Sequence, residues 1–135
     1  MDIIKVVCGI IFNDNKVFIC RRKQEKSLGG FWEFPGGKVE KGEQCEVSLS
    51  RELLEELGMK VEVKEHYKTI IHTYENYTIE LIAYKCIFFQ ATFQLTDHDS
   101  FEWVTVKDLD NWNLAPADIP IAKQLIMNDR EKDHP

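Results

Sequence analysis

The chain has 135 residues, a length typical of one domain, and we expect a single domain over residues 1–135. Hydrophobic residues make up 44% and charged residues 30%, which excludes a disordered segment, and no apolar run approaches the roughly 20 residues of a membrane-spanning helix. The formal net charge of −6, from 17 Lys and Arg against 23 Asp and Glu, disfavours a nucleic acid polymer as partner, because a basic surface supplies most of the affinity for its phosphates.

The four cysteines bear on the cellular compartment. Cys8, Cys20, Cys45 and Cys86 are widely spread and contain no CxxC pair, so the sequence predicts neither a zinc site nor a disulfide framework. The N-terminal residues lack the basic and then apolar layout of a secretory signal. We therefore expect a cytoplasmic protein with no membrane partner.

The first third of the chain predicts strands. Residues 3–12 are almost continuously apolar, an Asn/Asp turn follows at 13–15, and residues 16–21 continue the strand pattern, which together indicates a hairpin. The polar segment 23–30 predicts an exposed loop. Residues 31–34 predict a short strand that ends at the breaker 35–37.

The rest of the chain predicts a central helix, further strands and a closing helix. Residues 45–57 contain no Pro or Gly, Leu53, Leu54 and Leu57 form an apolar edge at helical spacing, and Gly58 stands where a helix ends. Strands are expected at 61–73, 78–89 and 101–106. A second helix is expected at 118–127, with Asp118 as its N-cap, before a frayed polar tail at 128–135. We therefore predict an α+β fold, a sandwich around one mixed sheet.

The central helix carries a cluster of acidic residues. Glu52, Glu55 and Glu56 stand at i, i+3 and i+4 and span an arc of about 100°, so their carboxylates leave one helix face. Such a cluster alone is more typical of a solvated acidic face. The turn at Gly36 and Gly37 upstream, whose backbone can approach a metal or a phosphate closely, favours a site for Mg²⁺ or Mn²⁺, which prefer oxygen ligands.

These residues belong to a longer pattern. The segment from Gly37 to Met59 resembles the Nudix box at every fixed position, over 23 residues. In it, Gly37 is followed after five residues by Glu43, and Glu43 is followed after seven residues by the run from Arg51 to Met59. The hairpin start, the chain length and residues 33–37 resemble the compact MutT-type branch of that family. The resemblance implies the Nudix fold, an α/β/α sandwich around a mixed sheet with a catalytic loop-helix-loop, and hydrolysis of a nucleoside diphosphate linked to another group.

The resemblance also implies roles for single residues. The implied metal ligands are the Gly36 carbonyl and the carboxylates of Glu52, Glu55, Glu56 and Asp97. An ion pair of Arg51 with Glu43 would orient the catalytic helix. Asp97 is the best match to a further acidic ligand that precedes a strand bearing Trp, here Trp103, although the family often has Glu there and the alternative is an ordinary turn residue.

The implied reaction is Mg²⁺-dependent, with Mn²⁺ as a possible substitute. By resemblance to MutT, water attacks the β-phosphorus of a nucleoside triphosphate and releases a nucleoside monophosphate and pyrophosphate. Glu55 or Asp97 is the candidate to take the proton of the water. Arg22 and Lys38 are candidates to hold phosphates, and the alternative for Arg22 is a solvated charge at a strand end.

Residues 114–120 align with the MutT region that contacts the base and resemble still more closely the bacterial CTP pyrophosphohydrolases of this branch. MutT has Asn at the position of Asp118. An ionised Asp only accepts hydrogen bonds, which favours the amino group of cytosine, whereas a buried protonated Asp would also admit oxidised purines. The candidates to stack on the base are Trp112, Phe31, Tyr74 and Tyr77, although each is more often a packing residue.

The sequence therefore predicts hydrolysis of 8-oxo-dGTP, of cytosine nucleotides such as CTP, dCTP and 5-methyl-dCTP, or of both, and Asp118 favours the cytosine nucleotides. The partner is a small nucleotide, and the protein is expected as a monomer or homodimer. Alternatives are a Nudix hydrolase of ADP-ribose or of a dinucleoside polyphosphate, and a non-catalytic nucleotide-binding module. A recognition domain of a DNA repair glycosylase is disfavoured by the acidic balance and the missing glycosylase domain.

Overall fold

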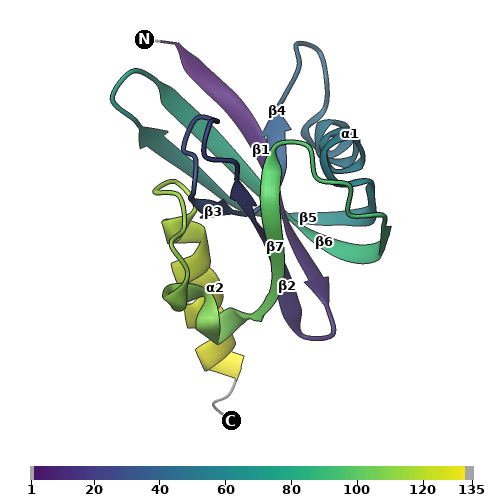
Figure 1. Cartoon of the computed structure of the whole chain (residues 1–135). Coiled ribbons are helices and arrows are strands. Elements are labelled where there is room, and N and C mark those ends of the chain that lie inside the picture. Colours follow the sequence, from purple (N-terminus) through teal and green to yellow (C-terminus); the bar gives the residue numbers. More distant parts are fainter. Residues whose placement is uncertain (1, 133–135) are drawn as a thin grey trace.

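The structure is a computed structural model and describes residues 2–132 (Figure 1). A mixed seven-stranded sheet lies between two helices. In chain order the elements are β1 (Ile3–Asn13), β2 (Lys16–Arg22), β3 (Trp32–Glu33), β4 (Gly36–Lys38), α1 (Cys45–Leu57), β5 (Met59–Thr73), β6 (Thr78–Ala91), β7 (His98–Thr105), the 3-10 helix η1 (Val106–Asn111) and α2 (Ile119–Lys132). No helix in this part of the chain is long and apolar enough to cross a membrane.

The sheet has the order β3-β2-β1-β6-β5, with β4 paired to β1 and β7 paired to β2. The long strands β1 and β6 are parallel, and the other pairs are antiparallel. The predicted hairpin of β1 and β2 is present, and its turn residues Asp14 and Asn15 have φ of 50° and 64°. Asn and Asp tolerate this left-handed conformation, which a tight hairpin turn requires.

Each face of the sheet carries one helix and one core. Leu49, Leu53 and Leu57 of α1 are fully buried on one face, and α2 buries Ile121, Ala122, Leu125 and Ile126 on the other. In Figure 1 the two helices accordingly lie on opposite sides of the strands. The α/β/α sandwich around a mixed sheet, predicted from the sequence, is confirmed.

Helix α1 has the predicted bounds. It ends at Gly58, which has φ 57° and ψ 34° and donates its amide to the carbonyls of the last turn. The expected place of Leu54 on the apolar edge of this helix was wrong. Leu54 is 52% exposed, because the buried stripe runs through residues 49, 53 and 57. Leu54 lies about 100° around the helix from Leu53. Strand β5 then begins at Met59, directly after the cap.

The polar tail differs from the prediction. We expected the closing helix to end at 127 and residues 128–135 to fray, but α2 continues to Lys132. Asn128 accepts a hydrogen bond from Gln124, 3.0 Å long, and donates one to the Tyr67 hydroxyl on β5. These contacts hold the last turns of the helix against the sheet. Residues 133–135 of the expected tail lie outside the described residues.

Candidate active site

Arg51 joins the acidic residues around α1. Its guanidinium makes a two-pronged ion pair with Glu43, with N···O distances of 2.9 and 3.0 Å, as expected from the sequence. Its third nitrogen donates to Glu52 at 3.0 Å and to Glu55 at 3.2 Å. The hydrogen bonds from Arg51 lower the pKa of Glu43 to about 2. The guanidinium therefore offsets part of the negative charge that this helix face collects.

Glu52 lies against the glycine turn of β4. A Cβ built on Gly37 would stand 2.3 Å from the Glu52 carboxyl carbon, so only glycine leaves room for this carboxylate. Gly36 precedes it and packs as closely on the backbone of β1, where a Cβ would stand 1.9 Å from the Val7 carbonyl oxygen. Burial raises the pKa of Glu52, although hydrogen bonds from Arg51 oppose the shift. The turn thus holds the Glu52 carboxylate against the backbone of Gly37.

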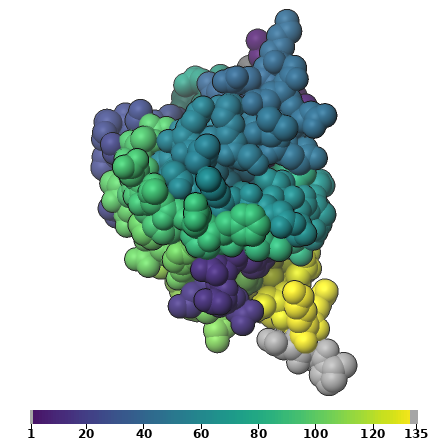
Figure 2. Space-filling model, turned by 90° about the vertical axis from the view of Figure 1, so that its right-hand side faces the viewer, coloured from purple at the N-terminus to yellow at the C-terminus, as the bar shows by residue number. Residues whose placement is uncertain are grey.

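Glu56 meets the segment that leads into β7. Its carboxyl group accepts a hydrogen bond from Thr96 at 3.2 Å and faces the carboxyl group of Asp97. Burial, and then the hydrogen bond and the charge of Asp97, raise the pKa of Glu56 to about 7. Figure 2 views this face, where α1 lies beside the green segment before β7. Thr96, 40 positions away in the chain, thus reaches the helix and brings the neighbouring Asp97 to Glu56, as the prediction for Asp97 requires.

The donor set fits a hard divalent cation. Two carboxyl groups that face each other form a site where a cation can offset the repulsion between their charges, and all of the predicted ligands offer oxygen. They are not a preassembled cage, however, because Arg51 engages Glu52 and Glu55, and Lys26 lies 3.2 Å from Asp97. Within residues 2–132, three potential ligand atoms lie within 4.8 Å of one another only at Cys20, Glu33 and His98, a group that the sequence did not predict.

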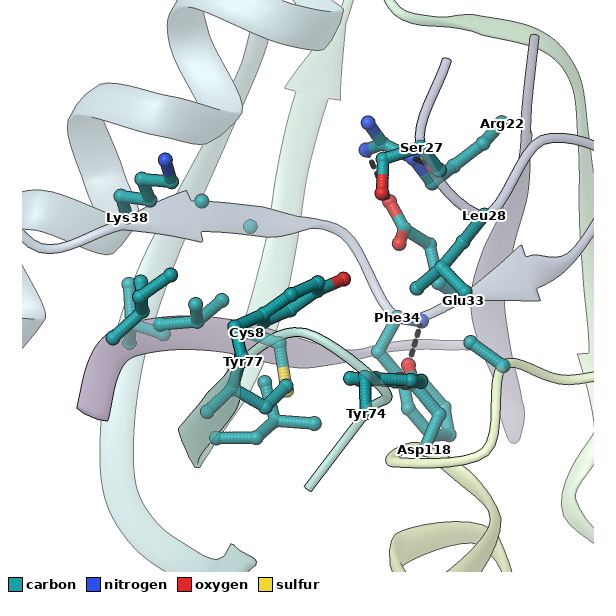
Figure 3. A pocket seen from close by; sticks show the side chains of 18 residues that line it. Cys8, Arg22, Ser27, Leu28, Glu33, Phe34, Lys38, Tyr74, Tyr77 and Asp118 are labelled. Carbon is teal, nitrogen blue, oxygen red and sulfur yellow. Dashed lines mark hydrogen bonds and ion pairs between the residues drawn. The ribbon is translucent and has the colours of Figure 1, made fainter. Parts of the chain in front are cut away.

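A cavity of about 510 Å³ opens beside this acidic face (Figure 3). Its walls come from β1, β4, β6, the facing ends of β2 and β3 with the loop between them, the β5–β6 turn and the residues before α2. The predicted substrate residues Arg22, Lys38, Tyr74 and Asp118 line it, together with Cys8, Glu33, Phe34 and Tyr77. Gly36 and Gly37 line it too, so the wall that touches Glu52 is also a wall of the cavity.

Asp118 is a buried acid on the wall of the cavity. It is 6% exposed, and its Oδ2 accepts a hydrogen bond of 2.8 Å from the Phe34 amide (Figure 3). Burial, and next the charge of Glu33, raise its pKa well above the usual range. Asp118 directly precedes α2, as expected of an N-cap, but the hydrogen bond that its carboxyl group makes in the described structure runs to Phe34.

The aromatic candidates divide into two groups. Tyr74 and Tyr77 line the cavity with ring centroids 5.2 Å apart, and the Tyr74 hydroxyl accepts a hydrogen bond from the Ala117 amide. Trp112 instead packs edge-to-face on Trp32, with centroids 4.6 Å apart, and is not among the described residues that line the cavity. Phe31 is likewise not among the described residues that line the cavity, so the geometry gives no support to a stacking role for Trp112 or Phe31.

Sequence reasoning missed Glu33 and His98. Glu33 lines the cavity, and its Oε2 lies 2.8 Å from Nε2 of His98, which is 2% exposed. A charged residue inside the apolar segment 31–34, directly before the breaker, was a signal for Glu33. Nothing local marks His98, because its partner lies 65 positions away.

Comparisons with known proteins agree with this geometry. Residues 6–124 match the family model of the NUDIX domain. The chain is 36% identical over 121 residues to a CTP pyrophosphohydrolase of Escherichia coli K12, covering 90% of both chains. It is 30% identical over 125 residues to an 8-oxo-dGTP diphosphatase of Buchnera aphidicola, covering 93% of this chain and 95% of the relative.

Solved structures give the same result. The solution structure of the mismatch repair protein MutT of methicillin-resistant Staphylococcus aureus 252, described as a Nudix hydrolase, superposes with a TM-score of 0.76 at 40% identity. The match covers 94% of this chain and 98% of that one. The box residues, the fold and these relatives together show that the chain belongs to the NUDIX domain family, as a Nudix hydrolase of the MutT type.

Proposed function

We propose that this protein hydrolyses nucleoside triphosphates to the monophosphate and pyrophosphate with Mg²⁺, and that Mn²⁺ can substitute. One observation carries the proposal. Gly37 lines the nucleotide-sized cavity and at the same time touches Glu52 of the acidic helix face. A base held in the cavity would therefore extend its phosphates along the Gly36–Lys38 strand toward the carboxylates of α1. The names of the two relatives, a CTP pyrophosphohydrolase and an 8-oxo-dGTP diphosphatase, support this substrate class.

The residues proposed to hold the metal are the Gly36 carbonyl, Glu52, Glu55, Glu56 and Asp97. Divalent cations bound there would neutralise charge on the phosphates and activate the attacking water. Arg51 orients the helix through Glu43, and Glu55 or Asp97 takes the proton of the water. Glu55 is the freer of the two, with 60% of its side chain exposed. Arg22 and Lys38 contact phosphates from the two ends of the cavity.

Asp118 is proposed to read the base. Its raised pKa favours a carboxyl group that keeps its proton, and such a group both donates and accepts hydrogen bonds. This supports an oxidised purine such as 8-oxo-dGTP beside cytosine nucleotides, whereas an ionised Asp118 would favour cytosine alone. Tyr74 and Tyr77 provide aromatic rings in the same cavity as Asp118.

The proposed location is cytoplasmic, and the four cysteines, which are free thiols, support it. The protein is proposed to act as a monomer or homodimer.

A substrate panel tests the proposal. Pyrophosphate release is measured with Mg²⁺ for CTP, dCTP, 5-methyl-dCTP, 8-oxo-dGTP, dGTP and ATP, with ADP-ribose and a dinucleoside polyphosphate in parallel. We expect pyrophosphate from 8-oxo-dGTP or the cytosine nucleotides in preference to ATP, and none in EDTA. Equal rates on every triphosphate would contradict base recognition by Asp118. Hydrolysis of ADP-ribose or of the dinucleoside polyphosphate, with no hydrolysis of any triphosphate, would contradict the proposed substrate class.

A further inference from the structure

His98 is a buried imidazole with one specific partner. Its Nε2 lies 2.8 Å from Glu33 Oε2, and its Nδ1 is buried without a hydrogen-bond partner. A carboxylate only accepts hydrogen bonds, so Nε2 carries the proton that is donated to Glu33. The pairing joins β7, directly after Asp97, to β3 at the wall of the cavity. A buried polar contact between distant segments constrains both of them.

The same oxygen of Glu33 also faces Arg22. Arg22 Nη1 lies 3.5 Å from Glu33 Oε2, and its Nε donates a hydrogen bond of 2.7 Å to the Ser27 carbonyl. The guanidinium is therefore held on two sides, by the loop after β2 and by Glu33. Figure 3 shows Arg22, Ser27 and Glu33 together at one end of the cavity. Its remaining N–H groups are the ones available to a ligand.

We propose that His98 is a positioning residue for nucleotide binding, acting through Glu33 on Arg22. Glu33 shares its Oε2 between the imidazole and the guanidinium, so Arg22 forms only a long ion pair. Without the imidazole, a carboxylate that is 17% exposed would lose a donor and draw Arg22 into a closer pair. The guanidinium would then turn away from the phosphates. The inference rests on the proposed function, in which Arg22 contacts the triphosphate.

Two substitutions at His98 separate this role from a merely structural one. His98→Leu removes the donor at similar volume, whereas His98→Gln places an amide N–H near the position of Nε2. With Mg²⁺ and the best triphosphate, we expect His98→Leu to raise KM about tenfold, the order of one lost charge-assisted hydrogen bond, with kcat within about threefold. His98→Gln should restore KM to within about threefold of the wild type. Equal KM values for His98→Leu and wild type would overturn the proposal.

Arg22 supplies a double-mutant test. In an Arg22→Gln background, His98→Leu should raise KM by less than about twofold, because its effect passes through Arg22. A full tenfold further rise would overturn the proposed path. His66→Leu is the matched control, since His66 is exposed on β5 and bonds to Thr69 away from the cavity, and its KM should be unchanged.

Direct binding keeps the test independent of turnover. The dissociation constant of the α,β-methylene analogue of CTP, measured by calorimetry with Mg²⁺, should rise about tenfold in His98→Leu, or in His98→Met, which also lacks the donor, if the leucine variant does not fold. A wild type that binds the analogue without hydrolysing triphosphates would refute the proposed function alone. The role of His98 would be refuted if the variants had the same dissociation constant as the wild type, or if the wild type did not bind the analogue.

Discussion

At the scale of single residues, Asp118 shows how the fold changes the chemistry of a side chain. From the sequence it is a helix-capping acid with a possible second role at the base. In the structure it is buried, its carboxyl group faces the charge of Glu33, and its hydrogen bond comes from the Phe34 amide. Burial opposes ionisation, so the folded protein holds the Asp118 proton more tightly than the unfolded chain does.

This raised pKa predicts how stability depends on pH. The stabilisation that comes from the protonated carboxyl group is fully present below the unfolded pKa of about 3.9, and it is lost as the pH rises through the higher folded pKa. Asp118→Asn does not titrate and can keep the hydrogen bond from Phe34. We therefore expect the free energy of unfolding of the wild type to fall relative to that of Asp118→Asn, by up to about 1.4 kcal/mol per pH unit in that window.

Urea denaturation at pH 5, 6 and 7 without added metal measures this difference. A constant difference between the two proteins over this range would mean that Asp118 ionises as it does in the unfolded chain. In that case, the argument for a donor at the base, and with it the support for oxidised purines, would fail.

At the scale of elements, the contact between β4 and α1 joins the cavity to the acidic face of α1. The pairing of β4 with β1 sets Gly37 opposite Val7, and α1 brings the Glu52 carboxylate onto the glycine. Glycine is needed at position 37 because the Glu52 carboxylate occupies the space that a Cβ would take. The position of Glu52 therefore depends on the strand pairing as well as on its own helix.

Gly37→Ala tests this contact. The added methyl group would displace the Glu52 carboxylate by an ångström or more, which can lower kcat about 10²-fold without unfolding the protein. Gly9→Ala is the matched control. Its Cβ meets Cys86 and Ile11 at 3.3 Å in the core, so we expect it to cost about 1 kcal/mol of stability while kcat is retained. Steady-state kinetics with urea denaturation of both variants makes the comparison, and a wild-type kcat in Gly37→Ala would argue against the placement of Glu52.

At the scale of the whole molecule, local signals predicted the framework. The run without Pro or Gly at 45–57 and the glycine after it defined α1, the Asn/Asp turn defined the hairpin, and the order of strands and helices defined the sandwich. The box motif predicted the family. Each of these features depends on residues that are close together in the chain, so a single sequence contains the information.

What the sequence did not predict depends on distant pairs. His98 and Glu33 lie 65 positions apart, and Asn128 extends α2 by contacting Tyr67, 61 positions away. Trp112 has the aromatic character of a base-stacking residue but packs on Trp32, which only the fold reveals. The contacts of Arg51 with Glu52 and Glu55 were not predicted either, although these residues lie only one and four positions away in the chain.

The central claim is that the carboxylates of α1 bind divalent cations beside the nucleotide cavity. Calorimetric titration of Mn²⁺ into the wild type, Glu52→Gln and Glu56→Gln tests it directly, with Glu62→Gln, an exposed residue paired with Lys64 on β5, as the control. We predict binding by the wild type and the control, and at least about tenfold weaker binding by the two helix variants. Equal Mn²⁺ affinity in all four proteins, or no binding by the wild type, would contradict the claim.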